Sequence, residues 1–370
     1  SNWTSNHHSA FIFVTGGMHV QTLRELYEDI SSDKNKWSYY PNTSFDIRNT
    51  WNDNKTALTF ITTYFDYAGK SECFKDQHLE DNHQYIESRA THIISTFLIG
   101  VKLFESFGIK IGPCDSNNMD LKYYWFLTCL YHDIGYAFEN SSTCEQLRML
   151  QSDGLDAIQE IADIKYLHER EFKTFCRKEI DLYLRGRAQC YQGKKGCIDH
   201  GIIGGLLLYD KLRRQFEISW KKRTLGTDCR GDFHIKDECS NRTLHLSNKH
   251  YDAYAKVADA IMIHNVWETS FNEYVDRYDA QNQLKKHTWK NRISKENSLC
   301  FILAIADTLE PLKRNLSLDD IRIESIPTGL GIKIEIVDTD HYKLNDLETW
   351  VAVTVNVSQC NNKKIFTISL

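Results

Sequence analysis

Residues 131–139 read YHDIGYAFE and set a histidine, His132, beside an aspartate, Asp133, at the end of an apolar run. The preceding residues, 120–132 (DLKYYWFLTCLYH), have the apolar spacing of a helix, and Gly135 is suited to ending it. Two adjacent ligands do not hold a catalytic metal alone. If this pair is a metal site, further ligands must come from elsewhere in the chain.

Four other segments also show the apolar spacing of helices. Asp199 is a good N-cap for one of them, and Pro311 is expected to stop another. These segments are residues 84–107, 197–214, 251–267 and 296–312. The sequence therefore predicts a mainly helical body with several buried helices.

Each of these helices carries a polar residue in an apolar setting, where burial is costly unless something satisfies it. One such histidine alone is usually a core residue, but the ordered set is a stronger signal. Imidazole and carboxylate together suit Fe, Mn, Zn or Co, with Mg as a further candidate, and six ligands are enough for two metals. The set is His92, His132, Asp133, His200, His264 and Asp307.

The order H…HD…H…H…D on a helical scaffold resembles the HD-domain superfamily of metal-dependent phosphohydrolases, over roughly residues 84–315. The two additional histidines resemble its six-ligand, binuclear branch. The stretches DHGIIGGLLL, ADAIMIHN and IADTLEP are similar to those of bacterial symmetrical dinucleoside-tetraphosphate hydrolases. The resemblance implies that all six residues are metal ligands and that Asp133 bridges the two metals.

The activity implied by the resemblance is hydrolysis of a phosphomonoester or phosphodiester, most simply of a nucleotide, by attack of a metal-bridging hydroxide. Arg89 and Lys313 are predicted to assist Asp133 in catalysis, although solvated helix ends are an equally good interpretation. The predicted substrate-binding residues are Tyr136, Glu139 and Arg314. Many family members have a lysine shortly after the HD pair, where this chain has Tyr136.

The expected fold class is mainly α, with α+β character overall. Residues 1–80 are an N-terminal extension that the pattern does not assign. Residues 81–317 form the HD-type helical domain, with a helical insertion at 141–196 that is predicted to cover the site. Residues 318–370 alternate and are rich in Ile, Val and Thr, which predicts a small antiparallel sheet.

Composition limits the kinds of binding partner and the cellular compartment that we expect. The net charge of −5 does not favour nucleic acid as a general partner, and no apolar run is long enough to span a bilayer. The 11 cysteines include no CxxC pair, and the first residues show no secretory signal. A cytoplasmic protein with reduced thiols, acting on a small phosphate-containing molecule, is therefore expected.

Other interpretations remain open at this point. The same six ligands suit a mixed-valence di-iron oxygenase, and an HD body can also act as a nucleotide-sensing or scaffold module without turnover. A structural zinc in the polar stretch 221–249 is disfavoured because its spacing is unusual, and a surface loop is expected there. Its candidate ligands are Cys229, His234, Cys239 and His245. Four aromatic residues are interpreted as core before base-stacking groups, namely Tyr123, Tyr124, Trp125 and Trp267.

Overall fold

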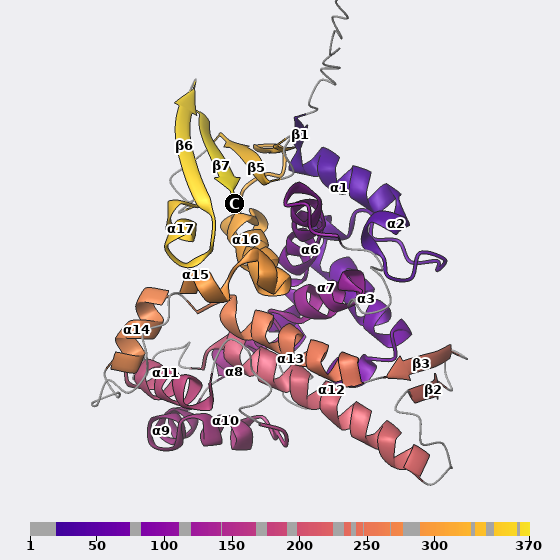
Figure 1. The fold of residues 1–370 in the computed structure, drawn as a ribbon, viewed down its shortest axis with the longest axis vertical. Helices are drawn as coiled ribbons and strands as arrows, with labels where there is room; N and C mark the ends of the chain where they lie inside the picture. Colours follow the sequence, from indigo (N-terminus) through magenta and orange to yellow (C-terminus); the bar gives the residue numbers. More distant parts are fainter. Residues whose placement is uncertain are drawn as a thin grey trace, which may run out of the picture.

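The computed structural model consists mainly of α-helices and contains one five-stranded antiparallel sheet, which confirms the expected fold class (Figure 1). It describes residues 20–74, 83–110, 120–141, 143–167, 176–190, 198–224, 233–237, 242–246, 248–266, 268–276, 289–326, 330–337, 344–360 and 363–370. Within these ranges, no helix combines the length and the hydropathy that crossing a bilayer requires.

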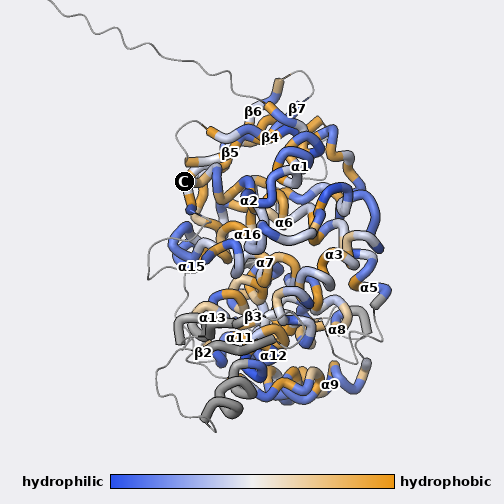
Figure 2. The backbone as a smooth tube through the Cα atoms, turned by 90° about the vertical axis from the view of Figure 1, so that its right-hand side faces the viewer, coloured by the Kyte–Doolittle hydropathy of each residue, from blue (hydrophilic) through white to orange (hydrophobic). Residues whose placement is uncertain are grey.

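Four helices pack against one another at the centre of the molecule. They are α6 (Ala90–Ser106), α7 (Leu121–Tyr131), α13 (Asn248–Ile263) and α16 (Ser298–Leu309). In α16 every side chain from Leu299 to Ala306 is buried, and a helix that is apolar all round belongs in a core. Figure 2 shows the hydrophobic colour concentrated around α6, α7 and α16. Tyr123, Tyr124 and Trp125 are buried in this core as expected, whereas Trp267 lies outside the described residues.

The remaining helices surround this centre. They are α1 (Leu23–Ser32), α2 (Lys34–Trp37), α3 (Asn54–Tyr67), α5 (His83–Glu87), α8 (Tyr136–Ser141), α9 (Cys144–Asp153), α10 (Leu155–Ile161), α11 (Arg177–Cys190), α12 (His200–Thr224), α14 (Glu268–Asp276), α15 (Trp289–Arg292) and α17 (Leu347–Trp350). Short 3-10 helices cover Thr50–Asn52, Ser71–Phe74, Lys295–Asn297, Leu312–Arg314 and Leu344–Asp346.

The segment 84–107 is broken into two helices where the sequence predicts one. The break falls between α5 and α6, at Ser88 and Arg89. Asn54, at the start of α3, accepts hydrogen bonds from the backbone N–H and the hydroxyl of Thr91 at 3.0 and 2.9 Å. Such a cap from a distant helix satisfies an N–H that a continuous helix would have bonded internally. The break starts a new helix two residues before His92.

The N-terminal region from residue 20 to 74 belongs to the same core as the rest of the molecule. Leu23, Leu26 and Tyr27 of α1 are buried, and α1 and α3 both contact α6. The Tyr27 hydroxyl lies 2.6 Å from the hydroxyl of Ser95 on α6. The region therefore supports the central helices directly.

The sheet has the strand order β1-β4-β5-β7-β6, with every pair antiparallel. The strands are β1 (Gln21–Thr22), β4 (Ile321–Ser325), β5 (Gly331–Ile336), β6 (Thr354–Cys360) and β7 (Lys363–Ser369). Ile323, Ile334 and Phe366 are paired across three strands and form part of its buried face. The sheet predicted from the last fifty residues thus exists, but it takes edge strand β1 from the other end of the chain.

The helical insertion contains α9, α10 and α11, which agrees with its predicted character. Its last helix, α11, packs on α14, where Tyr183 stacks on Phe271 with ring centroids 5.5 Å apart. Arg292 of α15 donates to Glu179 of α11 at 2.7 Å. The helix α11 is therefore fixed to the body rather than standing apart from it.

The prediction of a loop over residues 221–249 is wrong for the residues of that range that the structure describes. The helix α12 continues to Thr224, and β2 (Phe233–Asp237) pairs with β3 (Arg242–Leu246) as an antiparallel hairpin. Apolar residues alternate with polar ones at 233, 235, 244 and 246, a strand pattern that the many polar residues around it obscure. Cys229 and Cys239, two of the disfavoured zinc ligands, lie outside the described residues.

Candidate metal centre

All six predicted ligands lie at or near helix ends, and these ends meet in the middle of the molecule. His92 is in the first turn of α6, and His200 is the first residue of α12. His132 ends α7, and His264 follows the last residue of α13. Asp307 is in the last turn of α16. Asp133 lies in the turn after α7, between the other residues.

The Asp133 carboxylate is the centre of the cluster and is only 2% exposed. Its Oδ1 lies 3.4, 3.6 and 3.7 Å from the Nε2 atoms of His132, His200 and His264, respectively. Its Oδ2 lies 3.3 Å from Nε2 of His92. One carboxylate therefore faces all four imidazoles and uses both of its oxygens.

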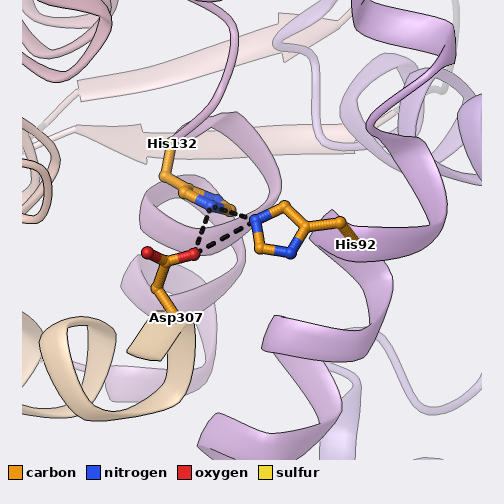
Figure 3. A group of neighbouring side chains, drawn as sticks. All are labelled: His92, His132 and Asp307. Atoms are coloured by element: carbon orange, nitrogen blue, oxygen red, sulfur yellow. Dashed lines mark hydrogen bonds and ion pairs between the residues drawn. The ribbon is translucent and has the colours of Figure 1, made fainter. Parts of the chain in front are cut away.

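Two overlapping groups of ligand atoms, which share His132, are each close enough together to hold an ion. The first is His92, His132 and Asp307, and the second is His132, Asp133 and His264. In the first group, Asp307 Oδ1 lies 3.1 Å from Nε2 of His92 and 3.7 Å from Nε2 of His132. Figure 3 shows these three side chains pointing toward one another from three separate helices. The His200 ring lies beside the second group, 5.1 Å from the His264 ring.

The two histidines at helix C-termini are oriented by their own helices. Nδ1 of His132 bonds to the carbonyl oxygen of Cys129, and Nδ1 of His264 to that of Ile261, both at 2.6 Å. A carbonyl oxygen can only accept, so Nδ1 carries the proton and Nε2 offers its lone pair to the cluster. Carbonyls in the last turn of a helix lack partners within the helix and are available for this.

The two histidines at helix N-termini are oriented by carboxylates from other elements. Nδ1 of His92 lies 2.6 Å from Oε2 of Glu310, and Nδ1 of His200 lies 2.5 Å from Oε2 of Glu139. A carboxylate behind the imidazole is the usual partner of a metal-binding histidine. All four rings are thus arranged to present Nε2 toward the two aspartates.

Charges in the cluster depend strongly on one another. Burial raises the pKa of the carboxyls of Asp133 and Asp307, but the surrounding imidazoles with Arg89 and Lys313 outweigh it and hold both pKa values well below the usual range. Burial also opposes a charge on His92, but the carboxylates of Glu310 and Asp133 raise its pKa to about 10. Buried carboxylates of this kind require nearby positive charge, which a proton or a metal ion can supply.

Gly135 allows the turn after α7 to approach α12. A Cβ built on Gly135 would lie 2.0 Å from the backbone oxygen of His200, which no side chain can tolerate. On the other face of α12, a Cβ on Gly205 would lie 2.6 Å from the backbone oxygen of Ala258. These close approaches bring the His132–Asp133 pair, His200 and α13 within reach of one another.

Two cationic side chains border the cluster. Arg89 Nε donates to Asp133 Oδ2 at 3.0 Å, and Lys313 Nζ donates to Asp307 Oδ1 at 2.8 Å. Tyr136 stacks on His200, with ring centroids 3.8 Å apart, and Arg89 Cζ lies 4.4 Å from the Tyr136 ring centroid. The Tyr136 ring therefore packs against protein groups, and its contact with a substrate stays a prediction.

The other two predicted substrate contacts have partners within the protein. Glu139 is engaged with His200, as described above. Arg314 Nη1 donates to the backbone oxygen of Glu310 at 2.5 Å. Arg314 thus supports the end of α16, and Glu139 supports the ring of the predicted ligand His200. Their contact with a substrate stays a prediction.

Two supporting residues are absent from the sequence-based list. Glu310 is fully buried and lies behind His92, and Arg187 of the insertion lies behind Glu139. An acidic residue just before Pro311, at the end of an apolar helix, is a signal for Glu310 that the sequence contains. No comparable signal exists for Arg187, which is one of several basic residues in a polar segment.

Comparisons of the chain with models of known protein families, with curated proteins and with solved structures find no match.

Proposed function

We propose that this protein is a metal-dependent phosphohydrolase of the HD-domain kind. It would hold two divalent transition metals and cleave a phosphomonoester or phosphodiester, with a nucleotide as the expected substrate. The observation that supports this most is the arrangement of the four imidazoles. Each has Nδ1 bonded to an acceptor, and each directs Nε2 to the Asp133 carboxylate.

The residues would divide between two metals. His92, His132 and Asp307 would hold the first metal. His200 and His264, which both face Asp133, would hold the second, with Asp133 shared between the two metals. A bound metal pair supplies Lewis acidity toward a phosphoryl oxygen and a water of lowered pKa. Soft thiolate ligands are absent from this set, so Fe, Mn, Zn and Co are the expected metals, and Mg is a further candidate.

Arg89 and Lys313 would bind the substrate. They lie on two sides of the cluster, on Asp133 and Asp307, respectively. A guanidinium has five N–H donors and an ammonium has three, so each can hold a carboxylate and also donate to phosphoryl oxygens. This local positive charge would attract an anionic substrate although the chain as a whole carries a net charge of −5.

A hydrolysis screen over nucleotides and simple phosphate esters tests the proposal, with the products separated by chromatography so that diester cleavage, which releases no inorganic phosphate, is also detected. It is run with Mn, Fe, Co, Zn and Mg in parallel, with and without oxygen, alongside metal analysis of the protein. We expect turnover that a chelator abolishes and that oxygen does not affect. Turnover that requires oxygen would favour the di-iron oxygenase, and full metal loading without any phosphoester turnover would favour a sensing or scaffold role.

A further inference from the structure

The insertion helix α11 reaches the back of the metal centre through Arg187, in its last turn. Arg187 Nη2 donates to Oε1 of Glu139 at 3.1 Å, and the other oxygen of Glu139 lies 2.5 Å from Nδ1 of His200. The Arg187 side chain is only 10% exposed. One guanidinium thus stands two contacts away from a predicted metal ligand.

Arg187 also contacts Asp199, which positions the backbone of His200. Its Nη1 lies 3.2 Å from Oδ2 of Asp199, and the Tyr183 hydroxyl donates to the same oxygen at 2.7 Å. The other oxygen of Asp199 accepts from the backbone N–H of Ile202 at 3.0 Å and caps α12. Since His200 is the first residue of α12, Arg187 helps to fix both its backbone and its ring.

The helix α11 is itself held in place, so the guanidinium has a defined position. A Cβ on Gly186 would lie 2.5 Å from the backbone oxygen of Tyr274 on α14, which shows how closely the two helices approach. Glu179, at the other end of α11, accepts from Arg292 of α15 at 2.7 Å. A rigid support of this kind is what an orienting contact requires.

The first metal position has a different support. Glu310, behind His92, accepts from the backbone N–H groups of Leu312 and Lys313 at 2.8 and 3.0 Å. These groups belong to the turn that directly follows α16. The insertion therefore supports the proposed second metal position, and the central helices support the first.

We propose that Arg187 is a positioning residue that sets the affinity of the second metal, through Glu139 and His200, and leaves the first metal unaffected. This rests on the proposed metal-dependent function. Loss of a partner behind a metal ligand costs about 10–100-fold in metal affinity. The insertion would then determine whether the centre holds one metal or two.

The test is a Co(II) titration of the metal-free protein, followed by calorimetry and by visible absorbance. Arg187→Lys keeps the charge but cannot hold Glu139 and Asp199 at once in the same geometry. We expect its first Co(II) equivalent to bind as in the unmodified protein and the second at least about tenfold more weakly. The matched control is Arg185→Lys, two residues earlier on α11, where the arginine pairs with Asp181.

Two further measurements separate orientation from a general loss of stability. Thermal unfolding of the metal-free variants shows whether they fold. In a His200→Ala background, adding Arg187→Lys should cause no further loss of Co(II) affinity, because the residue through which it acts is gone.

An unchanged second equivalent, equal weakening of both equivalents, or an additive loss in the His200→Ala background would each overturn the role of Arg187 and leave the proposed function standing. An unmodified protein that binds no metal at all would overturn both.

Discussion

His92 and His200 both stand at helix N-termini, yet they obtain their carboxylate partners from different parts of the molecule. Glu310 comes from the end of a central helix and is held by backbone N–H groups of the turn that follows. Glu139 comes from α8 and is held by a guanidinium of the insertion. The comparison teaches that one side of the candidate centre is supported by the central helices and the other by the segment 141–196.

A second contrast explains why these two histidines need distant partners at all. His132 and His264 stand at helix C-termini, where the carbonyl three residues earlier can accept from Nδ1 because no N–H four residues further along the helix occupies it. A helix N-terminus exposes N–H groups instead, and these cannot accept from Nδ1. A histidine there is oriented only if another segment brings an acceptor.

The largest expected effect comes from the residue that the two sides share. Asp133→Ala should remove both metals and abolish turnover, a loss greater than the ~100-fold typical of supporting residues. Metal analysis and chromatography of the hydrolysis products measure this. Asp319→Ala, which removes an exposed partner of Arg24, is the control and should behave as the unmodified protein. Full metal content and rate in Asp133→Ala would show that the assignment is wrong.

The next largest effect tests whether the His92 side and the His200 side of the centre have separate supports. Glu310→Gln should weaken the first Co(II) equivalent, and Glu139→Gln the second, each by about 10–100-fold. Each substitution removes the negative charge behind one imidazole. Glu105→Gln, an exposed partner of Lys102, is the control in the same titration. If both variants weakened the same equivalent, the division of the centre into two sides would fail.

The pH dependence of the first metal tests the His92 side alone. The pKa of His92 is raised from 6.5 to about 10 by Glu310 and Asp133 against the effect of burial, so near pH 8 the metal-free protein holds a proton that the metal must displace. First-metal affinity should therefore fall about tenfold for each pH unit lowered below 10, with about one proton released on binding. Calorimetry in buffers of different ionisation enthalpy measures that release.

The proton on His92 is expected to weaken first-metal binding but to stabilise the metal-free fold. A raised pKa gives a stabilising contribution that is fully present below pH 6.5 and is lost as the pH rises through about 10. Thermal unfolding of the metal-free protein between pH 8 and pH 10 checks this direction, with His92→Gln as the comparison. In the calorimetric experiment, first-metal binding that releases no proton would contradict the raised pKa of His92.

The smallest expected effect lies farthest from the metals, at Tyr27. Its hydroxyl meets Ser95, and Ser95 hydrogen-bonds the Glu310 side chain that orients His92. Tyr27→Phe should cost about 1 kcal/mol of unfolding free energy, because one buried hydrogen bond is lost while Ser95 can still bond Glu310. Denaturant unfolding measures it, and the more exposed Tyr39→Phe is the control. A loss of the second metal in Tyr27→Phe would contradict the separation of the two sides.

Periodicity alone predicted most of the central helices, because each buries a wide apolar face that the spacing reveals. It missed the break at Arg89, because the cap on Thr91 comes from Asn54, 37 residues before Thr91. It also missed the β2–β3 hairpin, whose alternation is diluted by polar neighbours, and strand β1, which is too short to carry a pattern. The break and strand β1 therefore depend on partners distant in sequence, whereas the hairpin pairs with nearby residues and was missed because its pattern is short.

The sequence by itself determined the kinds of ligand in the candidate centre and the helices that carry them, because helix spacing and side-chain chemistry are local properties. Only the tertiary structure decided which groups stand behind them. Glu310 is 218 residues from His92, and Glu139 is 61 residues from His200. Contacts at such separations depend on how the helices pack, and no pattern along the chain encodes that packing in a readable form.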